Sequence, residues 1–279
     1  MSGWLFPKIM VRLLVENTSG QYAKVNGLNM YYEDHGSGPP LVLIHGGIAA
    51  SGMNWAPSIP IFSKQFRVIA LDSRGHGKTD NPSGAFSYKL MADDTVALIK
   101  ELGLEKPVFY GWSDGGQIAL EIGMNYPGLA RAIISGGVLS ELSEHYLNGM
   151  RSFGALGPGK VSFDKFKETY PEFAGAMIEL HSPVYGDNYF VEDLFVNISK
   201  MWFNPKEFPG DRLTKISDPT LILHGDRDEV IPLEDPIRIY RMIPNSELAI
   251  VPGADHGSCI TQPERIAGIV IDYLQRLEG

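Results

Sequence analysis

Residues 111–115 read Gly-Trp-Ser-Asp-Gly, and this short segment constrains the fold of the chain more than any other. It follows an apolar run at 107–110 and precedes a stretch at 117–125 with apolar residues at helical spacing. A Gly-x-Ser-x-Gly pattern between a strand and a helix is typical of a nucleophile elbow. The turn is so sharp that a Cβ beside the serine would strike the strand or the helix, and glycine at both flanks removes that clash. We therefore predict that the Ser113 hydroxyl stands exposed at the end of a strand.

Apolar runs alternate with helical periodicity along most of the 279-residue chain. The largely unbroken apolar runs at 41–44 and 66–71 are typical of strands that are covered on both faces. The spacing predicts further strands at 130–134, 220–223 and 247–251, and helices at 88–102, 235–243 and 265–277. Strands that alternate with helices imply an α/β fold with a doubly wound, mostly parallel sheet. A hairpin signal at 22–33 predicts an antiparallel edge.

Residues 141–212 interrupt this alternation of predicted strands and helices. The stretch is too long for a simple connection, and it is rich in aromatic and Met residues. We interpret it as a small, mostly helical cap, or lid, inserted into a core made of residues 1–140 and 213–279. Two explanations for its aromatic side chains stay open: they hold the cap together, or they line a pocket for an apolar substrate.

The charge balance and the cysteine content bear on partners and location. The chain has 24 basic and 33 acidic residues and a net charge of −9, so no Lys/Arg cluster is at hand to neutralise nucleic-acid phosphates. Cys259 is the only cysteine, which excludes an intrachain disulfide. We interpret it as a small buried apolar residue. A lone cysteine fits a reducing compartment, and we expect a cytoplasmic protein.

The N-terminal residues 1–15 are apolar but are interrupted by Pro7, Lys8 and Arg12. They contain neither the unbroken apolar region nor the small-residue cleavage site of a signal peptide. They are also too short and too charged to span a bilayer. We expect an appended segment that packs on the body of the protein, and we predict no membrane span.

A serine hydroxyl becomes a strong nucleophile only when a base accepts its proton and a third group orients that base. In sheets of this kind the order along the chain is Ser, then Asp or Glu, then His. Four histidines follow Ser113. His145 and His181 lie in the cap and His224 ends a strand, whereas His256 lies in the loop after the last strand, where a base can reach the elbow. We therefore predict His256 as the base.

The loop after the penultimate strand supplies three carboxylates, Asp226, Asp228 and Glu229. Asp228 lies further out in the loop than Asp226 and is better placed to reach an imidazole, so we predict it as the acid. Asp226 is interpreted as a turn former that bonds nearby backbone N–H groups. It stays the alternative acid.

Acyl transfer also needs hydrogen-bond donors aimed at the oxyanion that forms. One predicted donor is the backbone N–H of Asp114, at the start of the helix after the elbow, where the helix dipole helps. The second is the backbone N–H of Gly47, in the glycine-containing loop 45–48 that follows the first buried strand. We interpret the His45 ring as a staple of that loop and not as a catalytic group.

Residues 72–80 form a charged, glycine-rich segment at the end of a strand. They lack a Walker pattern, and no G-x-G-x-x-G opens the first strand–helix unit, so nucleotide binding is disfavoured. We interpret the segment as a loop braced by an Asp–Arg pair. The histidines are scattered singly, without the spacing of a zinc site. We therefore expect neither a cofactor nor a metal ion.

Five motifs, taken in order, resemble those of the α/β-hydrolase family. They are Leu-Ile-His-Gly-Gly at 43–47, Asp-Ser-Arg-Gly-His-Gly at 72–77, Gly-Trp-Ser-Asp-Gly-Gly at 111–116, Gly-Asp-Arg-Asp at 225–228 and Asp-His-Gly at 255–257. The resemblance covers residues 22–278. It implies an eight-stranded, mostly parallel sheet with a helical cap, the acid at Asp228, the base at His256 and the loop donor at Gly47. The elbow is most similar to that of biphenyl-hydrolase-like, valacyclovir-hydrolase-type esterases.

These features predict a serine hydrolase that cleaves small carboxylic esters through an acyl-enzyme intermediate. Trp112 and Asp114, beside the nucleophile, are the predicted substrate-binding residues. Two roles stay open for the Asp114 carboxylate: it captures a substrate that bears an amine, or it only bonds neighbouring loop groups. Cleavage of a carbon–carbon bond in a ring-fission product, or opening of a lactone, with the same triad is the alternative. A non-catalytic ligand receptor on the same fold is the rival from another class.

Overall fold

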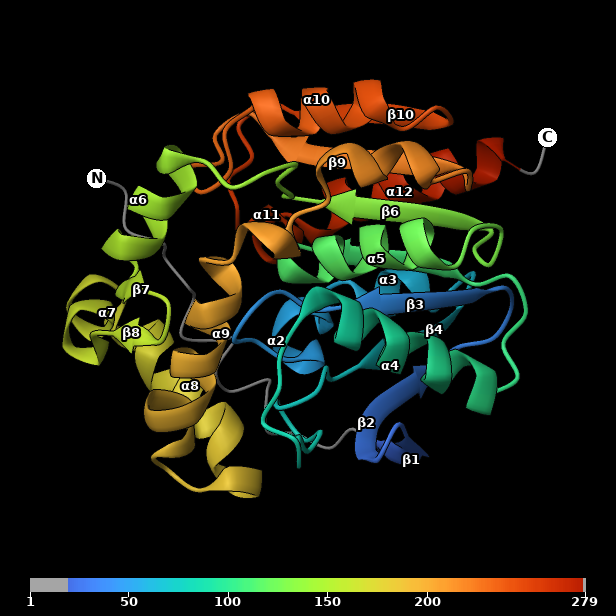
Figure 1. Cartoon of the computed structure of the whole chain (residues 1–279). Helices are drawn as coiled ribbons and strands as arrows, with labels where there is room; N and C mark the ends of the chain where they lie inside the picture. Colours follow the sequence, from blue (N-terminus) through green and yellow to red (C-terminus); the bar gives the residue numbers. More distant parts are fainter. Residues whose placement is uncertain (1–19, 278–279) are drawn as a thin grey trace.

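The computed structural model describes residues 20–277, so the predicted N-terminal segment at 1–15 lies outside the described residues. At its centre is an eight-stranded sheet with the strand order β1-β2-β4-β3-β5-β6-β9-β10 (Figure 1). The strands are β1 (Gln21–Val25), β2 (Leu28–His35), β3 (Pro40–Ile44), β4 (Arg67–Leu71), β5 (Val108–Trp112), β6 (Ala132–Gly136), β9 (Thr220–Gly225) and β10 (Ser246–Val251). β2 pairs antiparallel with β1 and β4, and the other neighbours in this sheet pair in parallel. The predicted α/β fold with a doubly wound, mostly parallel sheet is confirmed.

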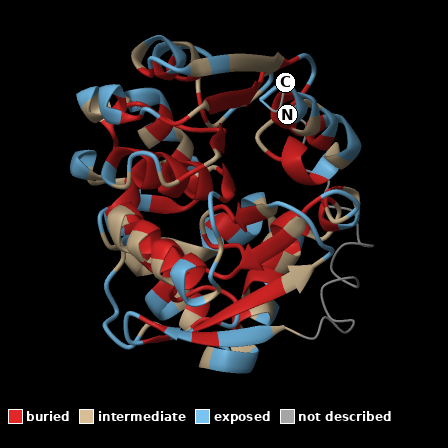
Figure 2. Cartoon of the chain, turned by 90° about the vertical axis from the view of Figure 1, so that its right-hand side faces the viewer, coloured by how far each residue is buried: buried red, intermediate tan, exposed pale blue. Residues whose placement is uncertain are grey.

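Helices cover both faces of the sheet, which explains why its inner strands are apolar without interruption (Figure 2). In β3, the side chains of Val42 and Ile44 belong to one core and those of Leu41 and Leu43 to the other. The first core includes residues of α4 (Tyr88–Glu101), α5 (Asp114–Asn125) and α10 (Glu234–Met242), and the second includes residues of α3 (Ile59–Phe62), α11 (Ser258–Thr261) and α12 (Pro263–Arg276). The short helix α2 (Ser51–Trp55) contributes to both, and neither α2 nor α3 was predicted.

Between β6 and β9 the chain forms a mostly helical segment, which lies beyond the end of the sheet at which β6 finishes (Figure 1). We call residues 141–212 the cap segment. The elements of this segment and of its exit are α6 (Glu144–Ser152), β7 (Ala155–Gly157), β8 (Lys160–Val161), α7 (Phe163–Thr169), α8 (Pro171–Tyr185), η1 (Phe190–Leu194), α9 (Phe195–Trp202), η2 (Pro205–Glu207) and η3 (Gly210–Lys215). The antiparallel pair β7–β8 was not predicted.

Aromatic side chains form the interior of the cap segment. Phe153, Phe166, Phe190 and Phe195 pack against one another, with ring centroids 4.7 to 6.1 Å apart. Offset and edge-to-face contacts at such distances stabilise a core beyond the burial of apolar area. The first explanation for the aromatic residues, that they hold this segment together, is therefore confirmed for these four.

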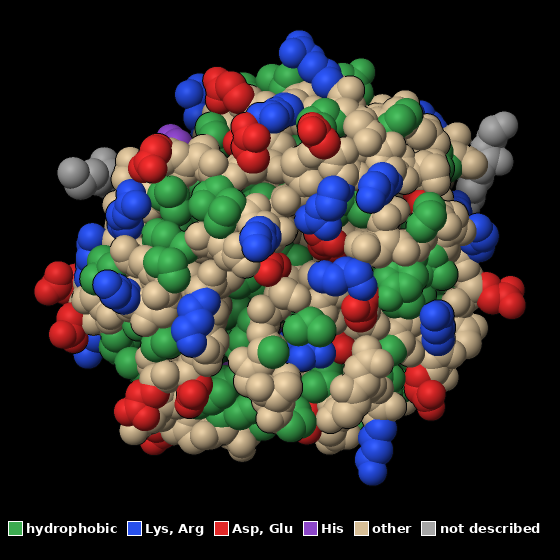
Figure 3. All heavy atoms as spheres, viewed as in Figure 1, with side chains coloured by type: hydrophobic (Ala, Val, Ile, Leu, Met, Phe, Trp, Pro, Cys, Tyr) green, Lys and Arg blue, Asp and Glu red, His purple; other side chains and the backbone are tan. Residues whose placement is uncertain are grey.

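The surface carries mixed side chains. On the face seen in Figure 3, acidic, basic and apolar side chains are interspersed. The exposed apolar side chains of Tyr22, Leu156 and Tyr240 lie on three different elements, β1, β7 and α10. Within residues 20–277, no helix combines the length and the apolar character needed to cross a bilayer.

The loop after β4 is braced by two buried acidic side chains. Asp72 accepts hydrogen bonds from the backbone N–H and the hydroxyl of Ser51 (2.8 and 2.7 Å) and from the backbone N–H of Lys78 (2.9 Å). Arg74 forms a two-pronged ion pair with Asp94 on α4, with N–O distances of 2.7 and 2.9 Å. An Asp–Arg pair therefore does brace this loop, but Arg74 finds its acid on a helix and not within the loop.

Asp94→Ala should lower the free energy of unfolding by about 3–5 kcal/mol, because it leaves the Arg74 guanidinium buried without its partner. The side chains of Arg74 and Asp94 are only 6% and 1% exposed. The control Asp93→Ala removes the neighbouring carboxylate, which is 30% exposed, pairs with Lys89 and accepts a hydrogen bond from the Tyr126 hydroxyl. It should cost less than about 1 kcal/mol. Urea unfolding of both variants measures the difference, and equal losses would contradict the account of a buried pair.

Candidate active site

Ser113 lies in the sharp turn between the end of β5 and the start of α5. Its backbone has φ 58° and ψ −121°, a region that residues with a Cβ rarely adopt. A Cβ added to Gly111 would overlap the carbonyl group of Gly115, and one added to Gly115 would overlap the carbonyl oxygen of Ile44. The predicted reason for glycine at both flanks is confirmed, because the turn can close only when these positions lack a Cβ.

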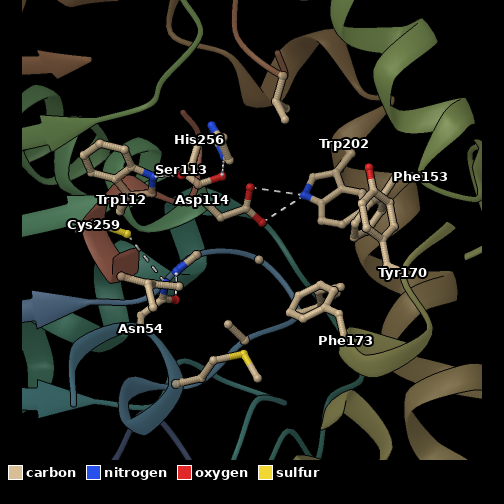
Figure 4. A pocket seen from close by; sticks show the side chains of 18 of the residues that line it. Asn54, Trp112, Ser113, Asp114, Phe153, Tyr170, Phe173, Trp202, His256 and Cys259 are labelled. Carbon is tan, nitrogen blue, oxygen red and sulfur yellow. Dashed lines mark hydrogen bonds between the residues drawn. The ribbon is translucent and has the colours of Figure 1, made fainter. Parts of the chain in front are cut away.

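Ser113, His256 and Asp228 form one hydrogen-bonded series, which we call the triad. Nδ1 of His256 lies 2.7 Å from Oδ2 of Asp228, and Nε2 lies 3.0 Å from Oγ of Ser113. Figure 4 shows the imidazole beside the serine. Oδ1 of Asp228 accepts hydrogen bonds from the backbone N–H groups of Val230 and Ile231, both at 2.9 Å. Because an ionised carboxylate only accepts, Nδ1 carries a proton, and Nε2 is left to accept one from the serine hydroxyl.

Burial and charge act in opposite directions on the triad. Burial lowers the pKa of His256, but the charge and the hydrogen bond of Asp228 outweigh burial and raise the pKa of His256 above its ordinary value. Burial raises the pKa of Asp228, but the interactions with His256 outweigh it, so the pKa of Asp228 is lowered. The carboxylate therefore stays ionised and stabilises an imidazolium, the form that results when the base has accepted a proton.

The other histidines and Asp226 are not part of this hydrogen-bonded series. His145 is exposed on the cap segment, and His181 is buried within it. Nδ1 of His224 lies 3.8 Å from Oδ2 of Asp228, which is beyond hydrogen-bond distance. Asp226 accepts a hydrogen bond from a backbone N–H in the loop after β10. Asp226 thus makes the kind of backbone contact predicted for a turn former, and the structure brings Asp228 to the imidazole of the triad instead.

The loop after β3 is held by hydrogen bonds on both sides. The His45 ring donates from Nδ1 to the carbonyl oxygen of Gly46 (2.7 Å) and accepts at Nε2 from the backbone N–H of Ser73 (2.9 Å). His45 is therefore the staple that we predicted. Oδ1 of Asn54 on α2 accepts from the backbone N–H of Gly46 (2.9 Å). No pattern around Asn54 in the sequence indicates this bond, so sequence analysis missed it.

Gly47 brings this loop directly against the elbow. A Cβ added to Gly47 would overlap the Asp114 carboxylate, so a side chain at this position would displace the carboxylate. Asp114 is the first residue of α5. The first N–H groups of a helix lack partners inside the helix and carry the positive end of its dipole. The two backbone N–H groups predicted as oxyanion donors therefore belong to segments that meet beside Ser113.

The side chains of Trp112 and Asp114 are engaged with protein groups. Nε1 of Trp112 donates to the carbonyl oxygen of His256 (2.7 Å). The Asp114 carboxylate accepts from the Tyr88 hydroxyl (2.7 Å) and from Nε1 of Trp202 in the cap segment (2.9 and 3.1 Å; Figure 4). Burial raises the pKa of Asp114 to about 6, although both hydrogen bonds and His256 act against it. Of the two open roles for Asp114, bonding to neighbouring groups is observed, and sequence analysis identified neither partner.

A cavity of about 140 Å³ lies over Ser113, between the sheet and the cap segment. Phe153, Tyr170, Phe173 and Trp202 line it from the cap side (Figure 4), so these four aromatic side chains do line a pocket, and an apolar substrate for it stays a prediction. The other lining residues are Gly46, Gly47, Ile48, Ala49, Met53, Asn54, Trp112, Asp114, Tyr146, Met150, Val230, His256, Gly257, Cys259 and Ile260. No Lys or Arg of residues 20–277 lines the cavity. In the same range, no group of three or more His, Cys, Asp or Glu side chains is arranged to hold a metal ion.

Comparisons with known proteins identify similar chains. The family model described as alpha/beta hydrolase fold matches residues 39–263. A relative from Metapseudomonas resinovorans, named 2-hydroxy-6-oxo-6-(2'-aminophenyl)hexa-2,4-dienoic acid hydrolase, is 25% identical over 92% of this chain and 91% of its own. The serine hydrolase BPHL from Mus musculus is 27% identical over 92% of this chain and 87% of its own. The solved structure of a meta-cleavage product hydrolase (CumD) superposes with a TM-score of 0.78 at 24% identity, covering 92% of this chain and 98% of that chain.

Asp228→Asn should lower the pKa of His256, because it removes the negative charge that raises this pKa against the effect of burial. NMR titration of the imidazole resonances measures the pKa directly. The wild-type imidazole should titrate above its ordinary value, and that of the variant below it. The control Asp226→Asn, whose carboxylate bonds a backbone N–H in the loop after β10, should leave the His256 titration unchanged. An unchanged titration in Asp228→Asn would contradict the electrostatic account of the triad.

Proposed function

Because the chain belongs to the α/β-hydrolase family, we propose that it is a serine hydrolase that cleaves small carboxylic esters through an acyl-enzyme intermediate. The observation that supports this most is the triad, with its hydrogen bonds of 2.7 Å and 3.0 Å from carboxylate to imidazole to hydroxyl. Such a series lets an imidazole take the serine proton as the oxygen attacks a carbonyl carbon.

In the proposed reaction, Oγ of Ser113 attacks the acyl carbon while Nε2 of His256 accepts its proton. Asp228 holds the imidazole in the tautomer that this transfer needs. The backbone N–H groups of Gly47 and Asp114 stabilise the oxyanion of the tetrahedral intermediate. As the intermediate collapses, His256 passes the proton to the leaving alcohol. Water then attacks the acyl-serine with the same help, which releases the acid and restores the hydroxyl.

We propose that the cap segment, residues 141–212, is a lid on a core made of residues 1–140 and 213–279. The aromatic rings that this segment presents to the cavity support the proposal. A lid that excludes water strengthens the interaction of the oxyanion with its donors, because the local dielectric is lower. It also supplies the apolar surface against which an acyl group packs.

The charges around the cavity favour uncharged esters over the substrates of carbon–carbon hydrolases. The relative from Metapseudomonas resinovorans is named for a dienoic acid, which carries a carboxylate. Burying a carboxylate without a cationic partner is costly, and no Lys or Arg of residues 20–277 lines this cavity. Its ionisable lining side chains include the acid Asp114. Lactones are uncharged, so they remain the second candidate class.

Trp112 and Asp114 both line the cavity and stay our proposed substrate contacts. The pKa of Asp114, about 6, leaves its carboxylate mostly ionised at neutral pH. A negative charge beside the oxyanion site opposes the transition state of a neutral ester, and it attracts a substrate that bears a protonated amine. We therefore propose that amino-acid esters are preferred over neutral esters of the same size.

Ser113→Ala should abolish multiple turnovers of p-nitrophenyl acetate, with a loss in kcat of about 10⁴-fold or more, because no other group replaces the attacking oxygen. Release of p-nitrophenol, followed by absorbance, measures the rate. The control Ser152→Ala, at the exposed end of α6, should keep the wild-type rate. A wild-type protein that releases less than one product per chain would contradict the ester proposal and leave a ligand receptor or a carbon–carbon hydrolase.

A hydrolysis panel should rank the substrate classes by kcat/KM. Neutral short-chain esters should exceed a ring-fission dienoate by at least tenfold, since the carboxylate of the dienoate would be buried without a cation. Lactones are the third substrate class for which kcat/KM is measured. Asp114→Ala should remove the preference for an amino-acid ester over its neutral analogue. A wild type that prefers the dienoate would overturn the ester proposal, and an unchanged amine preference in Asp114→Ala would overturn amine capture alone.

A further inference from the structure

One carboxylate joins three parts of the molecule beside the nucleophile. Asp114 belongs to the elbow, Tyr88 is the first residue of α4, and Trp202 is the last residue of α9 in the cap segment. Trp202 donates its N–H to both oxygens of the carboxylate, and Tyr88 donates its hydroxyl to one of them. Figure 4 shows the indole N–H pointing at the carboxylate, with Ser113 on the other side of Asp114. The position of the indole is therefore tied to the residue that follows the nucleophile.

The indole of Trp202 lies directly over the loop that carries the proposed oxyanion donor. A Cβ added to Gly47 would lie 2.8 Å from Cζ2 of Trp202, so ring and loop are in close contact. Behind the indole, the rings of Phe153 and Phe195 approach it edge-on, with centroids 6.1 and 6.4 Å away. Trp202 is thus a wall of the cavity that is supported from the side of the cap segment.

The position of the Trp202 indole relative to Ser113 and His256 decides which part of an ester it can contact. In Figure 4, His256 lies above Ser113, and Trp202 lies to the right, beyond the Asp114 carboxylate. The leaving alcohol of an ester must lie near His256, because His256 returns the proton to it. The acyl group must then point away from His256, and the indole of Trp202 is one of the cavity walls that it can meet there.

The carboxylate holds the indole firmly because its charge has few other partners. Asp114 is buried, and the hydrogen bonds to its carboxylate come from the neutral groups of Trp202 and Tyr88. Moving the indole away would leave a buried negative charge with one donor fewer, which is costly. The segment that follows Trp202 is held to the core at a second point, because Glu207 accepts a hydrogen bond from the backbone N–H of Tyr88 (2.9 Å).

We propose that Trp202 determines the length of the acyl group that the site accepts, and that Asp114 is the positioning residue that pins the indole in place. The proposal rests on the proposed ester hydrolysis and names a specificity determinant for it. A pinned indole admits short acyl groups, and an indole that is free to swing with the cap segment leaves room for longer ones.

The hydrogen-bonded contact of the Asp114 carboxylate with the Trp202 indole, which we call the pin, should depend on pH in a defined direction. The pKa of Asp114 is about 6, so its carboxylate is ionised above this pH and the two hydrogen bonds are then charge-assisted. As the pH falls through about 6, the carboxylate gains a proton and the pin weakens. Four titratable side chains face Asp114 from the surrounding elements: Tyr88 of α4, Tyr146 of α6, Glu207 of η2, and His256.

The test compares kcat/KM for p-nitrophenyl octanoate and p-nitrophenyl acetate, and it uses their ratio. Both esters depend on the same His256, so its titration cancels from the ratio. Trp202→Phe keeps an aromatic ring but loses the N–H, and it should raise the octanoate/acetate ratio about tenfold at pH 8. Tyr88→Phe removes the other donor without altering a cavity-lining residue, and it should raise the ratio by less. Both variants keep the Asp114 charge, so amine capture cannot explain a change.

Two controls separate the pin from a general loosening of the cap segment. Tyr189→Phe removes a different hydrogen bond between this segment and the core, from the Tyr189 hydroxyl to the carbonyl oxygen of Gly75 (3.0 Å), and should leave the ratio unchanged. Glu207→Gln removes the other carboxyl group near Asp114 and should keep the pH dependence of the ratio.

The wild-type ratio should rise as the pH falls through about 6, whereas the ratio of Trp202→Phe should stay flat. An unchanged ratio in Trp202→Phe, or an equal rise in Tyr189→Phe, would overturn this inference while ester hydrolysis stands. A wild type that hydrolyses neither ester would overturn the proposed function, and this inference with it.

Discussion

The strained turn at Ser113 is the constraint on which the rest of the site depends. Ser113 is held at φ 58°, although it has a Cβ. The turn closes only because Gly111 and Gly115 have no Cβ, which would overlap neighbouring backbone atoms. The surrounding structure can hold this strain because β5 is an inner strand of the sheet and α5 is buried along almost its whole length. The turn exposes one hydroxyl, starts a helix whose first N–H groups have no partner within the helix, and aims the Asp114 carboxylate at the cap segment.

The parallel sheet brings the remaining groups to this turn. The carboxyl ends of parallel strands meet at one edge, so the loops that follow them lie side by side. Gly47 follows β3, Ser113 follows β5, Asp228 follows β9 and His256 lies in the loop after β10. Gly47 and His256, which are 209 positions apart in sequence, therefore line the same cavity, under side chains that the cap segment supplies.

Local sterics and periodicity were enough to predict much of this from the sequence. The sheet, its longer flanking helices and the glycines around Ser113 follow from patterns within a few residues. The order Ser, Asp, His along the chain, and the loops in which these residues lie, predicted Asp228 and His256 near the elbow. The pairs Arg74–Asp94 and Asp114–Trp202 could not be predicted, because they depend on how a helix and the cap segment dock on the sheet. No short motif marks such long-range partners. The missed β7–β8 pair is only two to three residues per strand, too short for an alternation to appear.

Acylation of Ser113 tests the central claim most directly. Rapid quenching during turnover of p-nitrophenyl acetate, followed by peptide mass spectrometry, locates any covalent intermediate. The account predicts that the peptide containing Ser113 gains the mass of one acetyl group and that this adduct decays at a rate compatible with turnover. Full turnover without an adduct on that peptide, or an adduct on Cys259 instead, would contradict it.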